Sequence, residues 1–292
     1  MRITIFTPTY NRAYIIEKLY HSLQRQTCFD FEWLVVDDGS TDNTSELFAL
    51  WSKECKTFTI RYFKQENQGK CQAINYGLQL AEGDLFFTVD SDDYLTDDAI
   101  EKVIMWEETL PANEKYCGFA GNLGTNIGVT PNRLFDSSYF DGTALDRYSI
   151  VDGERAMVFY TDVHRKYLYP KFENEKFMTE AITWNRMAAD GYKIRFFNDI
   201  IWIYEYRGDG LTRAGNKLFV DNPYGYGLCI REKAEYLNYS FWLKIKLYYN
   251  FCCEFSDRLS AVKVAQCLKV PKVLIDCLFL LKKVRGLLRK SK

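Results

Sequence analysis

Three carboxylates are crowded into four positions where an apolar run ends. Asp90, Asp92 and Asp93 directly follow the run "FFTV". Like charges this close repel one another, and burying them is costly unless the charge is compensated. A bound cation or several hydrogen-bond donors would compensate it. Oxygen ligands suit Mg²⁺ or Mn²⁺, which commonly bridge to phosphate, so a nucleotide would supply both the phosphates and the donors.

Polar residues also follow two other apolar runs. The segment "PTYN" (8–11) follows the first run of the chain, and "DDGS" (37–40) follows "FEWLVV". A single Asp-x-Asp after a strand is weak evidence for a metal site, because Asp92 or Asp93 can equally cap the next helix. Two carboxylate clusters and a third polar segment at successive strand ends favour one common site.

Strand-like runs alternate with helical patterns four times in the first 110 residues. The expected strands are 2–7, 31–38, 58–63 and 83–90, and the expected helices are 12–26, 40–51, 69–81 and 96–110, with Ser40, Thr41 and Asp42 as candidate N-caps of the second helix. The strands are continuously apolar, which is typical of a parallel sheet covered on both faces. Ligands of such sheets bind beyond the carboxyl ends of the strands, where the polar segments lie.

Three segments carry a resemblance to a known family: "TPTYNRAYIIEKLYHSLQRQT", "WLVVDDGSTDNT" and "ENQGKCQAINYGLQLAEGDLFFTVDSDDYL". In this order they resemble the family 2 glycosyltransferases of the GT-A fold, the type that builds bacterial surface polysaccharide. The resemblance is dense over residues 2–98 and weaker to about residue 213. It implies an α/β fold, a Rossmann-like nucleotide-binding mixed sheet with helices on both faces, plus a C-terminal helical extension. It also implies an enzyme that takes a sugar from a nucleoside diphosphate, most readily UDP, and transfers it with inversion to a glycan or lipid-linked acceptor.

The resemblance assigns residues at the strand ends to the donor nucleotide. In this assignment Tyr10 stacks on the base; its alternative role is a core aromatic at a turn. Asp38 hydrogen-bonds the base and Asp37 anchors the loop, whereas Lys70 either neutralises phosphate or is simply solvated. The donor residues implied are Pro8, Thr9, Tyr10, Asp38, Asn67, Gly69, Lys70, Asp90 and Ser91.

The triplet Asp90-Ser91-Asp92 matches the DxD motif of the family. The resemblance gives Asp90 to the ribose or sugar and Asp92 to a metal, Mg²⁺ or Mn²⁺, that holds the donor diphosphate and offsets the repulsion between the carboxylates. Asp93 then supports the site from behind or caps the following helix. Gly39, which lacks a Cβ, suits a tight turn after Asp38.

A transferase also needs a base, because a sugar hydroxyl must lose its proton as it attacks. In "TEAITW" we expect Glu180 just inside a helix, with Trp184 four residues later on the same face. This spacing resembles the family's acidic motif, where the usual pair before the Trp is Glu-Asp rather than Thr179-Glu180. Glu180 is therefore the candidate base and Trp184 a candidate acceptor contact. In the alternative, Glu180 only favours the positive end of the helix.

Two arginines flank a glycine-containing segment near residue 210. Arg207 and Arg213 are candidates for clamping the diphosphate as the segment closes, with solvated surface residues as the alternative. Asp162 and Glu175 are fallback candidates for the base. These assignments divide the chain into a nucleotide-sugar-binding half (1–105), an acceptor-binding and catalytic half of the same domain (106–215) and a basic helical extension (216–292).

The formal net charge of −1 conceals an asymmetry. Residues 240–292 hold 12 Lys and Arg against 3 Asp and Glu, a net +9, which leaves 26 against 36, a net −10, for the remainder. The tail mixes these cations with large apolar residues, a pattern typical of amphipathic helices at a membrane interface. Its alternative is a helical hairpin packed on the catalytic domain or on a second subunit, as in a homodimer. Nucleic acid is not an expected partner, since no nucleic-acid-binding module accompanies the cations.

Cysteine usage and the absence of long apolar segments bear on location. Nine cysteines without a CxxC pair argue against a disulfide framework and against zinc. The N-terminus lacks the apolar core of a signal peptide, and no stretch approaches the ~20 apolar residues of a spanning helix. The sequence therefore predicts a cytoplasmic protein, peripheral on the cytoplasmic face of the membrane.

Two other classes of function remain as alternatives. A nucleotidyltransferase would share acidic metal ligands, but it usually has a glycine-rich basic loop after the first strand, and "TPTYNRAY" has no glycine. A catalytically silent nucleotide-binding scaffold would keep the pocket without a base. The presence of Glu180 together with Asp90 and Asp92 disfavours this second alternative.

Overall fold

The structure is a computed structural model that describes residues 1–125, 128–205 and 215–290. Its described residues divide into two compact units, one of residues 1–170 and 186–207 and one of residues 171–185 and 208–292. The boundary falls within helix α6 (Ala181–Ala189). The division into donor-binding, acceptor-binding and C-terminal parts at residues 105 and 215 concerns function, not compactness, and it stays a prediction.

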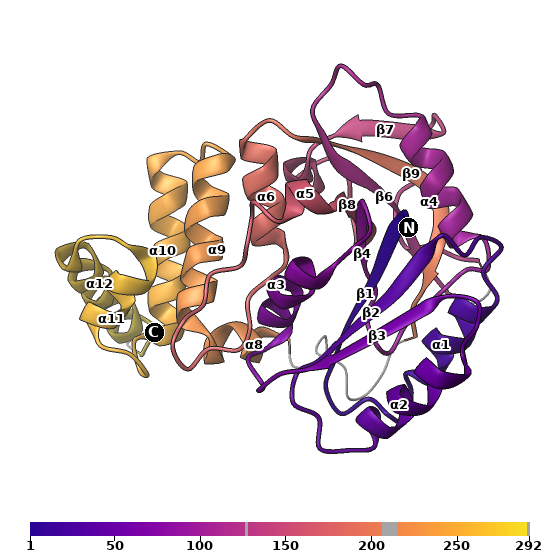
Figure 1. Cartoon of the computed structure of the whole chain (residues 1–292). Coiled ribbons are helices and arrows are strands. Elements are labelled where there is room, and N and C mark those ends of the chain that lie inside the picture. The colour runs from indigo at the N-terminus through magenta and orange to yellow at the C-terminus, as the bar shows by residue number, and fades with distance from the viewer. Residues whose placement is uncertain (126–127, 206–214, 291–292) are drawn as a thin grey trace. The chain divides into compact units, whose positions relative to one another are not determined.

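The first unit is built on a mixed sheet. Four of its strands are parallel neighbours in the order β3-β2-β1-β4: β3 (Thr59–Lys64), β2 (Phe31–Asp37), β1 (Ile3–Thr9) and β4 (Leu85–Thr88). β1, β2 and β3 lie side by side in Figure 1. β1 and β2 are buried along their whole length, as expected for strands covered on both faces, whereas the edge strand β3 is only partly buried.

The sheet continues beyond β4 with strands of mixed direction. The order is β8 (Arg155–Tyr160), β6 (Tyr116–Gly124), β9 (Lys193–Ile203) and β5 (Tyr94–Leu95), with β7 (Tyr139–Gly142) also paired to β9. β8 runs antiparallel to both β4 and β6, whereas β6 and β9 are parallel. The predicted mixed sheet is therefore confirmed.

Helices cover both faces of this sheet, as predicted. They are α1 (Glu17–Gln24), α2 (Thr44–Glu54), α3 (Lys70–Leu80), α4 (Ala99–Glu108) and α5 (Thr161–His164), with a short 3₁₀ helix at Ala144–Tyr148. α3 approaches β1 so closely that a Cβ at Gly77 would lie 2.2 Å from the ring of Phe6. Only glycine fits this contact.

The N-terminal end of the second helix was predicted too early in the chain. α2 begins at Thr44, and Asn43 before it makes no side-chain cap, so Ser40 and Thr41 are not N-caps. The Asp42 carboxylate does accept the Thr44 N–H, at 3.2 Å, at the start of the helix. Ser40 and Asp42 also accept backbone N–H groups of Asn11 and Ala13 across the strand ends, at 2.8 and 3.0 Å. A contact distant in sequence thus takes Ser40 away from the helix, whereas Asp42 joins the start of α2 to the turn after β1.

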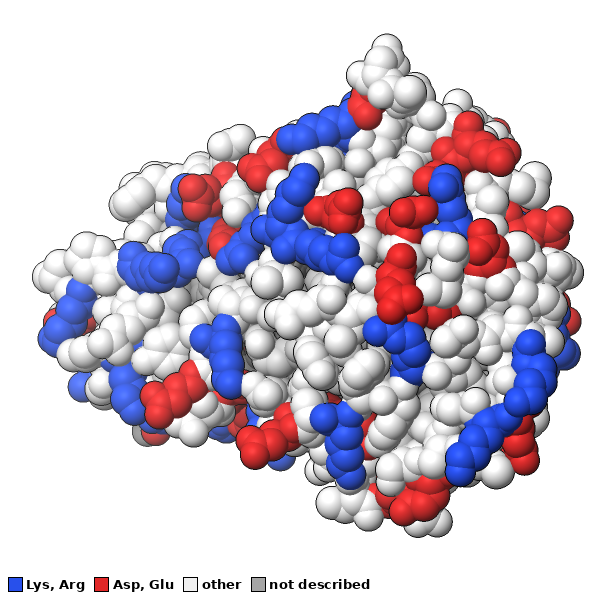
Figure 2. Space-filling model, viewed as in Figure 1, with Lys and Arg blue, Asp and Glu red and all other residues white. Residues whose placement is uncertain are grey.

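The second unit is helical. It holds α8 (Asn216–Asp221), α9 (Pro223–Tyr236), α10 (Phe241–Phe255), α11 (Ala261–Leu268) and α12 (Lys272–Lys290), which confirms the predicted C-terminal helices. Figure 2 shows Lys and Arg side chains spread over the visible face of this helical part. None of the helices within the described ranges combines the length and apolar character needed to cross a bilayer.

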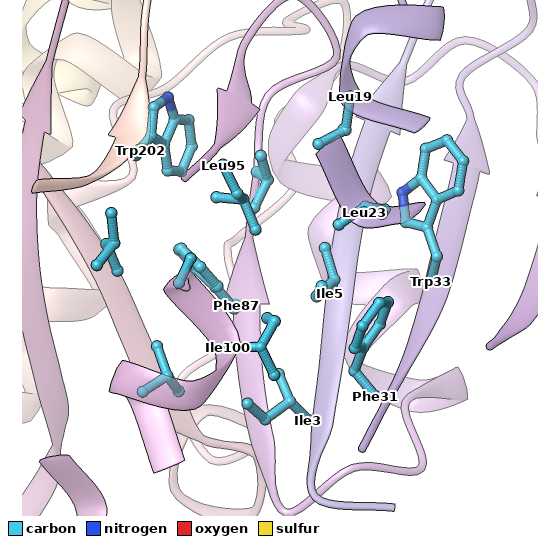
Figure 3. Close-up of a cluster of buried hydrophobic side chains, with 14 of the residues drawn as sticks. Ile3, Ile5, Leu19, Leu23, Phe31, Trp33, Phe87, Leu95, Ile100 and Trp202 are labelled. Carbon is cyan, nitrogen blue, oxygen red and sulfur yellow. The ribbon is translucent and has the colours of Figure 1, made fainter. Parts of the chain in front are cut away.

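The core of the first unit lies between the sheet and α1, α2 and α4. Its fully buried members include Ile3 and Ile5 of β1, Trp33 of β2 and Ile100 of α4 (Figure 3). Alternate residues of β1 point to the other face, where Phe6 stacks on Phe86 with ring centroids 5.0 Å apart. Each such side chain contributes roughly 1.5–3 kcal/mol relative to exposure.

A histidine lies inside the apolar layer on that second face. His164 ends α5 beside the rings of Phe86 and Phe159, and within the described part of the chain neither ring nitrogen has a hydrogen-bond partner. Burial lowers the pKa of His164 from 6.5 to about 3. The folded protein therefore keeps this imidazole neutral.

We expect His164 to make the folded protein less stable as the pH is lowered. Below pH 6.5 the imidazole of His164 is protonated in the unfolded chain. In the folded chain it stays neutral down to about pH 3. Between pH 8 and pH 5 the loss in free energy of unfolding from this residue is about 2 kcal/mol. Denaturant unfolding of His164→Phe at the two pH values should show the difference reduced by that amount. A difference equal to that of the wild type would contradict the prediction.

Candidate active site

The polar segments after β1, β2 and β4 leave the sheet at one edge. β1 lies between β2 and β4 and is parallel to both, so the three carboxyl ends point the same way. The N–H of Asp38 donates to the carbonyl of Thr9 at 2.8 Å, and that of Val89 donates to the carbonyl of Phe6 at 2.8 Å. From β1 the chain adds β2 and β3 on one side and then β4 on the other, so β1 and β4 form a topological switch point. Ligands of open α/β sheets bind at such switch points.

Asp38 organises the loop that leads into α3. One carboxylate oxygen accepts the Gln65 side-chain amide at 2.7 Å and the Gln68 backbone N–H at 2.8 Å, and the other accepts the Gly69 N–H at 2.7 Å. The side chain is 5% exposed. Hydrogen bonds to a buried carboxylate are among the stronger ones, so this residue fixes the path of residues 65–69, which include the predicted donor residues Asn67 and Gly69.

Asp37 anchors its own turn, as predicted. Its carboxylate is fully buried and accepts the Ser40 N–H at 2.7 Å and the Tyr62 hydroxyl at 2.5 Å. Burial, together with this bond to Asp37, raises the pKa of Tyr62. The predicted role of Gly39 in the turn is also confirmed, since its φ of +88° is a conformation that side chains disfavour.

The end of β1 presents Tyr10 to solvent. Its side chain is 48% exposed, so the alternative of a core aromatic is wrong. The preceding Thr9 is 2% exposed, and its hydroxyl has no hydrogen-bond partner within the described ranges. Asn11 follows with φ +53°, and its side-chain oxygen accepts the Thr41 N–H at 2.8 Å. Of the β1 end, Tyr10 is thus the side chain available to a flat ligand.

The carboxylates after β4 lie in unlike surroundings. Lys70 Nζ lies 2.6 Å from Asp90 Oδ1. Burial and the neighbouring charge of Asp90 raise the pKa of Asp92, whereas the charges of Arg12 and Lys70 act in the opposite direction. The sequence analysis did not name Arg12 as a site residue. Its position three residues after the end of β1, at the edge where the carboxylates lie, could have indicated it.

Asp93 points to another strand. Its carboxylate accepts the indole N–H of Trp202, on β9, at 2.8 Å. Burial and the charge of Asp90 raise the pKa of Asp93 to about 7. α4 begins only at Ala99, so neither Asp92 nor Asp93 caps it and that alternative is wrong. Trp202 could not be found from the sequence, because 109 residues separate it from Asp93.

Asp90 and Asp92 are the carboxylates suited to a cation. Within the described ranges, no group of three or more His, Cys, Asp or Glu side chains is placed to hold a metal ion. Mg²⁺ sites at phosphates commonly use only one or two carboxylates, with the remaining ligands from substrate and water. A partly buried carboxylate, such as Asp92, whose charged form is disfavoured by a like neighbour fits such a cation.

The candidate base lies in the second unit. Glu180 immediately precedes α6, which begins at Ala181, so its expected place inside the helix is wrong. The helix starts there because the Thr179 hydroxyl accepts the Ala181 N–H at 3.3 Å. Trp184 lies within α6, and its side chain is partly exposed.

The two fallback bases are engaged elsewhere. The Asp162 side chain is 89% exposed and pairs with Arg165 at 3.1 Å. Both oxygens of Glu175 accept backbone N–H groups at the start of α9, from Tyr224 at 2.7 Å and Gly225 at 2.8 Å. These contacts make both residues poor candidates. The diphosphate candidates Arg207 and Arg213 lie outside the described residues.

Glu175 is half of a reciprocal clamp. Asn222, just before α9, accepts the N–H groups of Lys176 and Phe177 at 2.9 and 3.1 Å. Its amide nitrogen also donates to the carbonyl of Leu218 at 2.7 Å. The segment 175–177, which leads to Glu180, is therefore tied to the start of α9 by four hydrogen bonds to backbone N–H groups.

Comparison with known proteins decides the family. The model of "Glycosyl transferase family 2" matches residues 4–160, more than half of the chain. The chain belongs to this family. The predicted resemblance is thus confirmed, and the activity of this glycosyltransferase is transfer of a sugar from a nucleotide-sugar donor.

One named relative and two solved structures are similar to this glycosyltransferase over most of its length. A GalNAc(5)-diNAcBac-PP-undecaprenol β-1,3-glucosyltransferase of Campylobacter jejuni is 27% identical over 288 residues, covering 95% of this chain and 87% of the relative. S. aureus TarS 1-349 in complex with UDP-GlcNAc is 17% identical with a TM-score of 0.64, covering 92% and 84%. A mannosyltransferase of Pyrobaculum calidifontis in complex with GDP-Man and Mn²⁺ is 18% identical with a TM-score of 0.57, covering 98% and 87%. The two structures support the GT-A fold.

We expect Asp38→Ala to release the 65–69 loop of the glycosyltransferase. The substitution removes three hydrogen bonds to a buried carboxylate, each worth roughly 1.5–3 kcal/mol. Amide hydrogen exchange at Gln68 and Gly69 should accelerate by about tenfold or more. Asp38→Asn keeps one acceptor oxygen and should give an intermediate rate. Unchanged protection in both variants would show that the loop is held by other contacts.

We expect the Glu175–Asn222 clamp to act as one unit. Glu175→Ala leaves two N–H groups without their acceptor and should lower the free energy of unfolding by about 1–3 kcal/mol, and Glu175→Gln by less. In a double-mutant cycle with Asn222→Ala the two losses should not add, because both hold the same segment. Strict additivity would contradict the clamp.

Proposed function

We propose that this glycosyltransferase moves a sugar from a UDP-sugar to a hydroxyl of a glycan or lipid-linked acceptor, with inversion at the anomeric carbon. The observation that carries the proposal is the pair Asp90 and Asp92 at the β1/β4 switch point. There, burial and mutual repulsion disfavour the charged form of Asp92, which a cation bound with a diphosphate would favour. UDP-GlcNAc bound to the structurally similar TarS supports the choice of UDP.

The donor nucleotide lies along the strand ends in this proposal. Tyr10, exposed at the end of β1, stacks on the base, and Asp38 holds the Gln65–Gly69 loop beside it. Lys70, now paired with Asp90, turns to the diphosphate when the donor binds. The full donor set is Pro8, Thr9, Tyr10, Asp38, Asn67, Gly69, Lys70, Asp90 and Ser91.

Asp92 holds Mg²⁺ or Mn²⁺ in the proposal, with Asp90 beside it toward the ribose or sugar. The Mn²⁺ and GDP-Man of the Pyrobaculum mannosyltransferase structure support the use of a divalent cation. When bound, the cation neutralises negative charge on the departing nucleoside diphosphate. Arg12 and Lys70 contribute positive charge to the same carboxylate cluster.

Glu180 is the proposed base. Its carboxylate takes the proton of the acceptor hydroxyl while the hydroxyl oxygen bonds to the anomeric carbon and the bond to the nucleoside diphosphate breaks. Trp184 offers an aromatic face to the acceptor sugar. The clamp of Glu175 and Asn222 fixes the segment that leads into Glu180, which favours a defined position for the base.

The acceptor and the tail complete the proposal. The Campylobacter relative is named for an undecaprenol-linked acceptor, which supports a lipid-linked acceptor here. Residues 240–292 then hold the enzyme at the cytoplasmic face of the membrane through cations and apolar side chains. Residues 1–105 bind the donor and residues 106–215 the acceptor in this division.

A thermal-shift panel tests the donor site. UDP-, GDP-, CMP- and dTDP-sugars are added to the wild type with and without Mn²⁺. A donor at about 100 times its dissociation constant stabilises the fold by roughly 2.7 kcal/mol. We expect a UDP-sugar to give this shift only with Mn²⁺ and Asp92→Ala to abolish it. Asp97→Ala, the loss of an exposed carboxylate in the same segment, is the matched control and should keep the shift.

Turnover tests the base separately. Glu180→Gln should retain the donor-dependent shift but lose transfer and donor hydrolysis by about 10²–10⁴-fold. If no nucleotide sugar stabilises the wild type with or without metal, the proposed donor site is wrong. If Glu180→Gln turns over normally, the base is another residue.

A further inference from the structure

Of the three carboxylates that follow β4, Asp93 has partners of its own in the protein. It accepts the indole N–H of Trp202 on β9 at 2.8 Å, and the backbone N–H of Glu205 also donates to it. Among the residues that the structure describes, no three such side chains are placed to share a metal ion. Asp93 is therefore used for contacts within the protein, and Asp90 and Asp92 remain as the pair suited to a cation.

Trp202 is a donor with a fixed position. Its side chain is 7% exposed and belongs to the apolar core, where its ring centroid lies 6.0 Å from that of Phe87 on β4. Its backbone is paired with that of Leu95 on β5. Figure 3 shows the three side chains in one cluster, with the indole nitrogen on the side turned away from Phe87. Since close packing in a core restricts a side chain to one rotamer, the N–H group has a defined place.

The turn that carries Asp90 and Asp92 is held at both ends. Before the turn, the N–H of the fully buried Val89 donates to a carbonyl of β1 at 2.8 Å. At its end, the N–H of Asp93 donates to the carbonyl of Asp90 at 3.2 Å, and the side chain of Asp93 is bound to Trp202. Asp92 lies between these two anchors. The hydrogen bond to β9 thus limits how far the turn can move.

A second indole in the same core shows that no carboxylate is needed to satisfy such an N–H group. Trp33 is fully buried and donates to the neutral hydroxyl of Thr7 at 3.0 Å. Asp93, in contrast, carries its charge beside the two like charges of the same turn, which costs free energy. A hydrogen bond to a carboxylate is stronger than one to a neutral acceptor. The choice of a carboxylate for Trp202 therefore favours a firmly held turn at the expense of repulsion.

We propose that Trp202 is a positioning residue of the cation site, because its hydrogen bond to Asp93 fixes the turn that presents Asp90 and Asp92. The inference rests on the donor and cation sites proposed above and adds to them a residue of β9, 109 positions along the chain from Asp93. Trp202 contacts neither the cation nor the donor in this proposal. Removal of a group that orients the surroundings of metal ligands typically weakens metal binding by about 10–100-fold.

Mn²⁺ binding to the full chain tests the proposal. Free Mn²⁺ is followed by electron paramagnetic resonance at increasing protein concentration, without nucleotide, with UDP and with GDP. Trp202→Phe keeps an aromatic ring and removes the N–H group, so it should weaken Mn²⁺ binding by about 10–100-fold. Trp33→Phe is the matched control, because it removes an indole hydrogen bond from the same core. It should be less stable in denaturant and bind Mn²⁺ as the wild type does.

Amide hydrogen exchange gives a second readout that needs no cation. In cation-free protein the N–H at position 93, which closes the turn, should exchange at least about tenfold faster in Trp202→Phe than in the wild type or Trp33→Phe. Asp93→Ser removes the same hydrogen bond from its other side and should lose the same protection. A carboxylate that served only as a cation ligand would leave this exchange unchanged.

Each outcome bears on a different part of the proposal. If Trp202→Phe binds Mn²⁺ as the wild type does, the cation site stands and the positioning role is refuted. If Asp93→Ser abolishes Mn²⁺ binding without faster exchange in cation-free protein, Asp93 is a ligand and the positioning role is also refuted. If the wild type binds no Mn²⁺ with either nucleotide, the cation site proposed above fails, and the positioning role fails with it.

Discussion

The parallel pairing of β1 with a strand on each side is the constraint on which the candidate donor site depends. Because β2 and β4 both run in the direction of β1, the chain leaves all three strands at one edge of the sheet. Tyr10, Asp38 and Asp90 reach that edge from segments up to 80 residues apart only through this pairing. The buried side chains of both faces keep the strands in register, so the core and the site are two consequences of one arrangement.

The carboxylates at this edge divide into two kinds according to their partners. Asp37 and Asp38 are buried and their oxygens accept hydrogen bonds from the loops around them, so their charge is used to shape the site. Asp90 and Asp92 repel each other, and their positive neighbours are the side chains of Lys70 and Arg12. The first kind prepares a rigid frame, and the second leaves negative charge where a cation can act.

The second unit solves a different physical problem. Its helices share a core of their own, and α9 is tied through Glu175 and Asn222 to the segment that precedes α6. α12, which completes this core, also leaves apolar side chains such as Val273 and Leu287 exposed. The sequence alone could not separate these roles, since an amphipathic pattern does not state which apolar positions a neighbouring helix covers.

Sequence alone determined the α/β class, the alternation of strands and helices through residue 110, the family and the candidate residues at the strand ends. Continuous apolar runs and the order of three motifs carry that information locally. Only the tertiary structure decided that Ser40 and Asp42 hold the turn after β1, that Asp38 holds the 65–69 loop and that Asp93 meets Trp202. These contacts join residues between 29 and 109 positions apart, and no local pattern records which distant donor a carboxylate will meet once the chain has packed.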